Sequence, residues 1–230
     1  MKYNLINITL LLFFVSSFAQ QKTNIEIIDS IQKNVLNSKN QDSLSIANAH
    51  YRIGELYRFK FLGDSAYFYY NKAEKIYRKL KYDYKTALTL YGIATVQCNE
   101  NDLTGSELTS IEAISLLESV KETNDVIKYK SYVYNNLGLI FGELEQYEES
   151  ISYYNKSIDL KKSLIGNTRI TIDIGKNNLA LSYKKSGNYK LALENYSQIL
   201  ANKNLITARP DMYALVLDNY SHTLYIYKNL

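Results

Sequence analysis

The chain has 230 residues, with one proline, nine glycines and a formal net charge of +4. This length allows one or two domains with a sizeable core, and so few prolines and glycines suit long helices joined by short turns. The charge is modest and mixed in sign, without a basic stripe, so the sequence does not indicate a nucleic-acid partner. The 23 tyrosines and the absence of tryptophan suit a helical protein with much surface, because tyrosine packs its ring and leaves its hydroxyl at a wet edge.

Residues 1–19 have the pattern of a secretory signal peptide. One lysine precedes an apolar run at 8–15, which is too short to span a bilayer. Ser17 and Ala19 place small residues at the positions that a signal peptidase reads. The end of this segment resembles signal peptides of Bacteroidota, which implies export to the periplasm. The alternative is an uncleaved membrane anchor, and we expect no transmembrane segment beyond it.

Residues 20–43 are expected to form an N-terminal capping helix followed by a loop. Apolar residues recur there at helical spacing: Ile27, Ile28, Ile31 and Val35. The polar stretch at 37–43 has the composition of a loop.

From residue 44 onwards a two-part pattern recurs, and its clearest copy lies at 125–164. The first part consists of Tyr134, Leu137, Gly138 and Phe141, and the second part of Ser150 and Tyr154. Because Gly138 has no side chain and Ser150 is small, two antiparallel helices can approach closely at this height. The pattern therefore predicts a helical hairpin.

Two other copies match this pattern well. The copy at 44–82 contains Ile53, Gly54 and Tyr57, a turn at Gly63 and Asp64 that supplies an N-cap, and then Ala66 and Tyr70. The copy at 169–205 contains Leu179, Ala180 and Tyr183 and then Ala192 and Tyr196, although Lys176 stands where a large apolar residue is expected. Both copies predict further hairpins.

The copy at 84–122 is degenerate, because no aromatic residues occupy the usual places. We align Ala94 with Gly138, since Ser106 and Ala113 then keep the small-residue spacing of the second helix. A register with Gly92 in the small position is the alternative.

An incomplete fifth copy occupies 211–230. Pro210 marks the start of its helix, since proline is tolerated in a first helical turn. The helix carries an apolar stripe that a second helix would normally cover: Leu217, Tyr220, Leu224 and Tyr227. Bare stripes of this kind mark interfaces. We therefore expect self-association through this helix, or a longer protein whose next helix covers it.

The small residues of the first helices are predicted to be packing sites: Gly54, Ala94, Gly138, Ala180 and Ser221. They are separated by 40, 44, 42 and 41 residues. The pattern resembles the tetratricopeptide repeat, whose standard unit has about 34 residues. The resemblance implies an all-α fold, a right-handed superhelical solenoid of antiparallel helix pairs over 44–230. HEAT or armadillo repeats, which have units of similar length, are the alternative fold.

No group of residues indicates catalysis. His50 and His222 each lie within a helical repeat and have no ligand partner at a suitable spacing. Cys98 is the only cysteine and cannot form an intramolecular disulfide. The acidic residues at 143–149 are typical of a solvated surface at a helix start. We therefore predict no enzyme activity, no metal site and no cofactor.

Polar residues immediately before the Leu–small pair mark a candidate binding surface. They are Asn135 and Asn136, Asn177 and Asn178, and Asp218 and Asn219. Amides at one height in successive units can pair with the backbone of an extended peptide in a concave groove. They can equally hydrogen-bond the neighbouring helix or face water, and the sequence does not separate these interpretations.

The Asn-Asn-Leu-small-x2-aromatic block, in repeats of this length, resembles kinesin light chains and bacterial Rap-type peptide receptors. In those families the asparagine just before the leucine holds the ligand backbone, which implies such a role for Asn136, Asn178 and Asn219. Arg52 and Gly92 stand at the matching positions of the first two copies, so any groove is weaker there.

With its signal peptide, the chain also resembles the extracytoplasmic sensory part of Bacteroidota regulators, over about residues 44–228. In those proteins the repeats precede a membrane helix and a histidine kinase or DNA-binding output. The sequence therefore predicts an exported scaffold that binds a peptide or protein segment. The alternative is the sensor region of a truncated signal-transduction protein. The ligand is not named by the sequence, because repeat folds leave specificity to surface residues.

Overall fold

The computed structural model describes residues 24–37, 41–166 and 169–229, and the predicted signal peptide lies outside them. Nearly all of these residues are helical, and none lies in a strand. None of the helices in these ranges is both long and apolar enough to cross a membrane. The chain divides into two compact units, residues 1–82 and 83–230, and each is described by itself.

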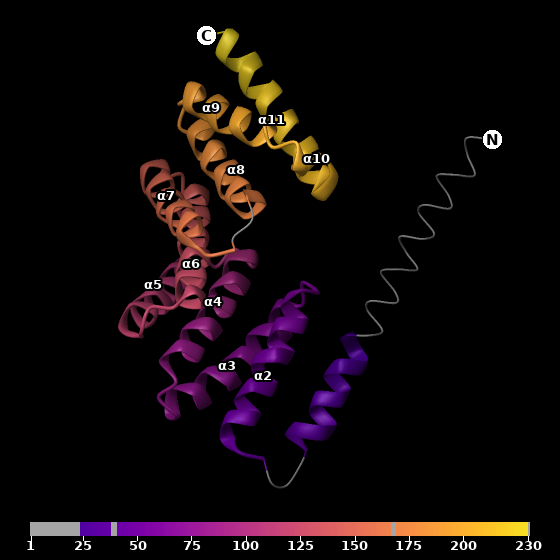
Figure 1. The fold of residues 1–230 in the computed structure, drawn as a ribbon. Helices are drawn as coiled ribbons and strands as arrows, with labels where there is room; N and C mark the ends of the chain where they lie inside the picture. Colours follow the sequence, from indigo (N-terminus) through magenta and orange to yellow (C-terminus); the bar gives the residue numbers. More distant parts are fainter. Residues whose placement is uncertain (1–23, 38–40, 167–168, 230) are drawn as a thin grey trace, which may run out of the picture. The chain divides into compact units, whose positions relative to one another are not determined.

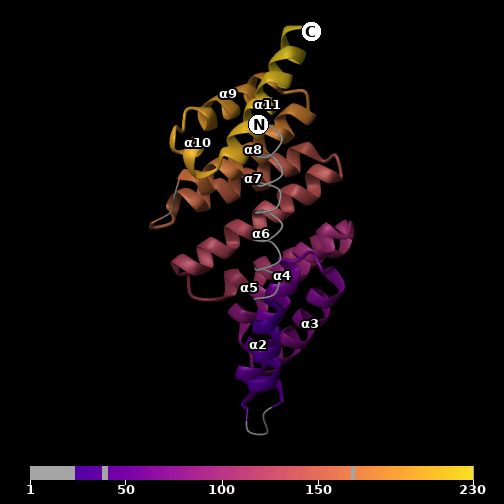
Figure 2. The ribbon, with the colours of Figure 1, turned by 90° about the vertical axis from the view of Figure 1, so that its right-hand side faces the viewer.

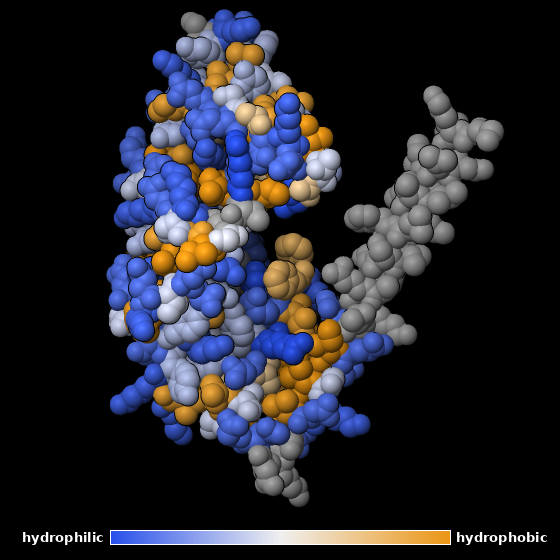
Figure 3. Space-filling view, in the orientation of Figure 1, coloured by the Kyte–Doolittle hydropathy of each residue, from blue (hydrophilic) through white to orange (hydrophobic). Residues whose placement is uncertain are grey.

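Unit 1 holds the N-terminal helix and the first helix pair. The helix at 24–31 continues into the π-helical turn η1 (Gln32–Leu36), and α2 (Ser43–Arg58) and α3 (Gly63–Lys79) follow. η1 contacts α2, and hydrophobic side chains gather where the N-terminal helix lies beside α2 (Figure 3). The prediction that the turn at Gly63 and Asp64 supplies an N-cap is wrong. α3 begins at Gly63 without a side-chain cap, and Asp64 lies in its first turn, where negative charge is favourable.

Unit 2 contains three helix pairs and two further helices. They are α4 (Asp83–Asn99), α5 (Leu103–Ser119), α6 (Asn124–Glu143), α7 (Tyr147–Ser163), α8 (Arg169–Lys185), α9 (Tyr189–Leu200), α10 (Asn204–Ala208) and α11 (Pro210–Lys228). The prediction that Pro210 starts a helix is confirmed. The short helix α10 was not predicted from the sequence, and it is anchored by the fully buried Leu205.

The first helices of the pairs adjoin one another in unit 2. α6 contacts both α4 and α8, and α5, α7 and α9 lie on the other side of these helices (Figures 1 and 2). We call the side formed by α4, α6 and α8 the first-helix face.

One kind of short turn joins the two helices of each pair. Phe61, Asn101, Glu145 and Gly187 all have a positive φ in these turns. In each case the next residue donates its N–H to a carbonyl five positions back, as from Gln146 to Phe141 over 2.9 Å. This pattern satisfies carbonyl groups at the end of the first helix. The turn therefore reverses the chain without needing glycine at every copy.

Close packing of a small residue against a tyrosine ring joins the helices of a pair. A Cβ atom on Gly54 would lie 2.7 Å from Cδ1 of Tyr70, and one on Gly138 would lie 2.7 Å from Cδ1 of Tyr154. Atoms do not approach so closely without displacement, so these positions have no room for a side chain. Ala180, at the matching position of α8, is fully buried in a cluster with Tyr196.

In two pairs of unit 2, a serine of the second helix also bonds to the small residue of the first helix. The buried hydroxyl of Ser150 donates to the carbonyl of Gly138 over 2.7 Å, and Ser106 donates to Ala94 over 2.7 Å. This recurrence favours the register with Ala94, rather than Gly92, in the small position. The pair α4–α5 differs in having the buried Ser110 where Tyr154 stands in α7.

The packing of Gly138 predicts a stability loss for Gly138→Leu. The added side chain must displace the Tyr154 ring, which should lower the free energy of unfolding by about 1–3 kcal/mol. Thermal melts of this variant and of Leu139→Ala, a change at the partly exposed neighbour, measure the difference. Equal melting temperatures for Gly138→Leu and the unmodified chain would contradict the packing described.

Candidate functional site

A cluster of tyrosines occupies the first-helix face between α4 and α6. Tyr84 and Tyr91 of α4 meet Tyr129 and Tyr132 of α6, with ring centroids 5.7–6.2 Å apart. All four residues are half-buried, so the rings pack against one another and remain partly accessible to solvent. This cluster was not predicted from the sequence. The high tyrosine count was the only indication of such a cluster in the sequence. It does not show which rings meet, because the paired rings belong to two separate helices.

A stripe of partly exposed residues extends this cluster along α6. Lys128, Tyr132, Asn135 and Leu139 recur at helical spacing and so lie on one side of the helix. The stripe offers a cation, an aromatic ring, an amide and an apolar side chain in succession. Such a sequence of groups suits the backbone and side chains of an extended segment better than it suits a compact small molecule.

Asn136 does not belong to this surface, contrary to the prediction. Its side chain is buried, and its amide nitrogen donates to the hydroxyls of Ser106 over 3.2 Å and Ser110 over 3.1 Å on α5. The amide fits there because Ser110 replaces the tyrosine found in other pairs. The interpretation in which an asparagine bonds the neighbouring helix is correct for Asn136.

The matching residue of α8, Asn178, has a different surrounding. Tyr154 fills the corresponding place on α7 and packs in one core cluster with Leu179. Asn178 remains half-buried and donates its amide nitrogen to the side-chain oxygen of Asn135 over 3.3 Å. The two amides thus link neighbouring first helices at the first-helix face.

The other three predicted groove residues lie apart from this pair. Asn177 is half-buried, and its side-chain oxygen is buried with no hydrogen-bond partner in the described residues. Asp218 is exposed on α11, and Asn219 beside it is half-buried. The six predicted positions therefore do not form one regular ladder.

Ser221 is not a packing residue, although the sequence predicted that role. It is exposed, and its hydroxyl donates to the carbonyl of Leu217 within the same helix over 2.8 Å. α11 instead packs on α9 through residues that include Met212 and Val216. Of the predicted apolar stripe, Tyr220 packs against the same core cluster, whereas Leu217 and Tyr227 remain 45% and 48% exposed.

The residues considered for catalysis have ordinary surroundings. Burial and the nearby Lys72 lower the pKa of His50, which favours its neutral form, and His222 lies 2.9 Å from the ammonium of Lys184. Burial raises the pKa of Cys98, so its thiol is poorly suited to act as a nucleophile. Within the described ranges no group of three or more His, Cys, Asp or Glu residues could hold a metal ion.

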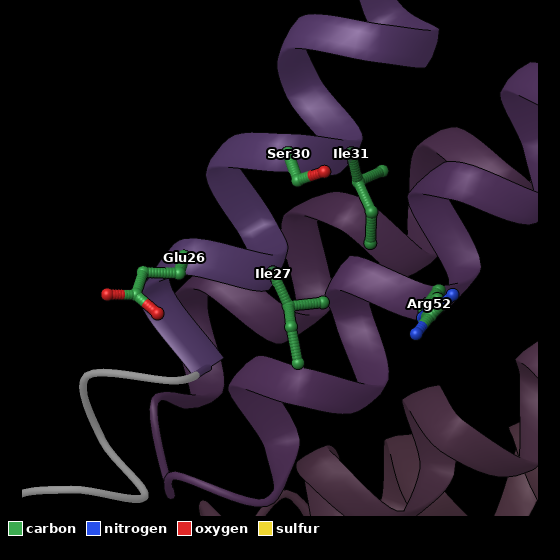
Figure 4. Close-up of a pocket in the computed structure, with 5 residues that line it drawn as sticks. All are labelled: Glu26, Ile27, Ser30, Ile31 and Arg52. Carbon is green, nitrogen blue, oxygen red and sulfur yellow. The ribbon is translucent and has the colours of Figure 1, made fainter.

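In unit 1 the N-terminal helix occupies the side of α2 that carries Arg52. A cavity of roughly 300 Å³ there is lined by Glu26, Ile27, Ser30, Ile31 and Arg52. The side chains of Ile27 and Ile31 point in the same direction from the N-terminal helix, whereas the side chain of Glu26 points away from them (Figure 4). Arg52 stands at the position that matches Asn136 and Asn178. Within unit 1, the N-terminal helix therefore covers the side of α2 that corresponds, in the repeat pattern, to the first-helix face of unit 2.

Lys161, at the end of α7, is a buried residue whose burial was not predicted from the sequence. It is only 5% exposed, and burial lowers the pKa of its ammonium to about 8. The spacing of Lys161 could have indicated its burial, because this residue follows Tyr154 and Ile158 along the core side of the helix. Gly175 of α8 lies beside it, since a Cβ there would lie 3.0 Å from Cγ1 of Ile158 and 3.4 Å from the lysine Nζ.

The lowered pKa of Lys161 predicts a pH-dependent stability. The unfolded chain, with an ordinary lysine pKa, binds more protons than the folded chain between about pH 8 and pH 10.5. The free energy of unfolding should therefore rise with pH across this window, by about 2 kcal/mol between pH 7 and pH 9.5 relative to Lys161→Met.

Denaturant unfolding of both proteins at several pH values measures this difference. Lys162→Met is the control, because Lys162 is exposed and paired with Asp159 at 2.9 Å. A pH-independent difference between the unmodified chain and Lys161→Met would show that the ammonium is not buried in solution.

Sequence comparison identifies one family over about a third of the chain. Residues 129–204 match the family profile described as tetratricopeptide repeat. No curated protein matches the sequence.

Several solved structures have a similar fold. BtubC (BKLC) from P. vanneervenii aligns with a TM-score of 0.66 and 17% identity, over 82% of this chain and 73% of that chain. A Rap protein complexed with competence and sporulation factor has a TM-score of 0.68 and 20% identity, over 87% of this chain and 54% of that chain. A putative kinesin light chain from Podosopora anserina with TPR-like repeats has a TM-score of 0.60 and 13% identity, over 85% and 94%.

These similarities establish the fold alone, because all the identities are low. This chain spans only about half the length of the Rap protein. The predicted fold class, an all-α solenoid of antiparallel helix pairs, is confirmed in preference to the HEAT or armadillo alternative.

Proposed function

Because residues 129–204 match the tetratricopeptide repeat and the chain has the fold of such proteins, we propose that it is a non-catalytic scaffold that binds a protein or peptide segment. The first-helix face of unit 2 is the proposed binding surface. The observation that carries this proposal is the α6 stripe, which places Tyr132 of the tyrosine cluster one turn from the linked amides of Asn135 and Asn178.

The chemistry of this face supports an extended ligand. Half-buried tyrosine rings give a ligand apolar contact at a small entropic cost, because they are already packed against one another. The amides of Asn135 and Asn178 retain unused donor and acceptor capacity, since one hydrogen bond occupies only part of what two amides can form. A Rap protein of similar fold was solved in complex with competence and sporulation factor, which supports ligand binding by a chain of this fold.

We further propose that the chain acts outside the cytoplasm, on the basis of the signal-peptide pattern at 1–19. Sequencing of the mature N-terminus would test this, and an intact Met1 would contradict cleavage. The alternative role, as the sensory region of a longer signalling protein, would use the same face.

The proposed surface predicts which amides matter for binding. Replacing both Asn135 and Asn178 with alanine should weaken retention on an array of short random-sequence peptides by about tenfold or more. Each lost hydrogen bond costs about 1 kcal/mol, and 1.4 kcal/mol corresponds to a factor of ten. Fluorescence of the labelled chain on the array measures retention.

Two single variants serve as controls. Asn155→Ala changes an exposed amide on the second helix α7 and should leave both retention and melting temperature unchanged. Asn136→Ala should lower the melting temperature, because it removes the donor to two buried serine hydroxyls. Retention that survives the double substitution would place the binding surface elsewhere.

We also propose that α11 joins two copies of the chain through Leu217 and Tyr227, the exposed part of its apolar stripe, which is the same on both copies and can therefore pair by twofold symmetry. Sedimentation should show a mass that rises with concentration, and Leu217→Gln with Tyr227→Gln should restore the monomer. A monomer at every concentration would contradict this proposal.

A further inference from the structure

A cavity of roughly 390 Å³ lies in unit 1, where η1 meets α2 and α3. Its volume lies in the range of sites that hold small ligands. Each of the three elements contributes two of the lining residues: Gln32 and Leu36 from η1, Ile46 and His50 from α2, and Tyr69 and Lys72 from α3. The proposed peptide surface belongs to unit 2, so this cavity is a separate feature of the chain.

The lining residue His50 is buried, and its hydrogen bonding is incomplete. Only 8% of its surface is exposed, and its Nδ1 has no hydrogen-bond partner among the described residues. Its ring lies near that of Tyr69, with the two centroids 5.8 Å apart. A buried nitrogen without a partner is unfavourable, so a ligand that bonds to it offsets part of that cost. The wall of the cavity therefore holds a polar atom that a ligand can satisfy.

The hydroxyl of Tyr69 is a second group that can donate to a ligand. It accepts the side-chain N–H of Gln32 over 2.9 Å, which leaves the hydrogen of the hydroxyl for another acceptor. The ring of Tyr69 also stacks on Tyr57, with the centroids 5.6 Å apart. These contacts fix the position of the hydroxyl before a ligand arrives, which lowers the entropic cost of binding.

Lys72 gives the lining one positive charge, and no carboxylate is among the described lining residues. Its Nζ lies over aromatic rings, 4.2 Å from the ring centroid of Phe68 and 6.0 Å from that of Tyr69. Burial and the charge of Lys72 lower the pKa of His50, so His50 is neutral near pH 7 and can still donate one N–H. One cation without an arginine suits a carboxylate better than a phosphate, for which the planar fork of arginine is well suited.

We propose that this cavity binds a small aliphatic acid in its carboxylate form. Lys72 is the ion-pair partner of the carboxylate, and Nδ1 of His50 and the hydroxyl of Tyr69 donate hydrogen bonds to its oxygens. Leu36 and Ile46 supply apolar surface for the hydrocarbon chain of the ligand. This site does not depend on peptide binding by unit 2.

The chain has only two histidines, which allows a direct test by nuclear magnetic resonance. The full chain is labelled with nitrogen-15 in its histidine rings and titrated with hexanoate at neutral pH. The Nδ1 resonance of His50 should shift and reach saturation, because this nitrogen gains a hydrogen-bond partner. His222 is the internal control, since it is exposed on α11 of unit 2, and its resonances should not change.

A matched probe and two variants test the ion pair. Hexanamide has a similar shape without the charge, and it should bind about tenfold or more weakly than hexanoate. Lys72→Met should weaken hexanoate binding by about fivefold, a modest loss because Lys72 is exposed and water screens its charge. Lys75→Met removes another exposed lysine of α3 that is not among the lining residues, and it should leave hexanoate binding unchanged. Thermal melts confirm that both variants fold.

Each outcome supports or overturns the carboxylate site. Saturable shifts of His50 that need higher concentrations of hexanamide, and higher concentrations of hexanoate in Lys72→Met, support it. Equal affinities for the acid and the amide, or for the unmodified chain and Lys72→Met, overturn the ion pair and with it the proposal. Shifts that do not saturate, or that occur equally at His222, overturn specific binding. An unchanged His50 resonance overturns the site and leaves the proposed function intact, because peptide retention is measured separately.

Discussion

The structure depends on one contact, the approach of a tyrosine ring to a first helix that has no side chain at that height. Gly138 leaves 2.7 Å between a hypothetical Cβ and the Tyr154 ring, and Gly54 has the same relation to Tyr70. The fixed position of the ring sets the distance between the two helices of a pair. It also sets which residues of the first helix turn towards the second helix and which remain on the other side.

The properties of the first-helix face follow from where this contact is present and where it is not. α5 has Ser110 in place of the tyrosine, and the space is taken by Asn136 from the following helix. α7 retains Tyr154, so Asn178 cannot enter and bonds Asn135 instead. Two asparagines at matching sequence positions thus have opposite roles. One closes a packing gap between neighbouring pairs, and the other remains at the surface proposed to bind a ligand.

The fold could be predicted from the sequence because the spacing of residues within each hairpin determines it. The Leu-Gly pair at 137–138 and the small residue at 150 lie within one hairpin, and their relation needs no distant contact. The site could not be predicted to the same extent. Whether Asn136 faces solvent depends on Ser110 in the preceding pair. The tyrosine cluster joins α4 to α6, and Lys161 of α7 lies beside Gly175 of the next helix. These relations cross between pairs, and periodicity within one helix does not show them.

The most direct test of the central contact is a double-mutant cycle between Gly138 and Tyr154. The free energies of unfolding are measured for the unmodified chain, Gly138→Ala, Tyr154→Leu and the double variant. If the ring occupies the space above the glycine, removal of the ring should relieve the crowding caused by the alanine. The double variant should then lose less stability than the sum of the single changes, by about 1 kcal/mol or more. Strictly additive losses would show that the two residues do not determine each other's packing.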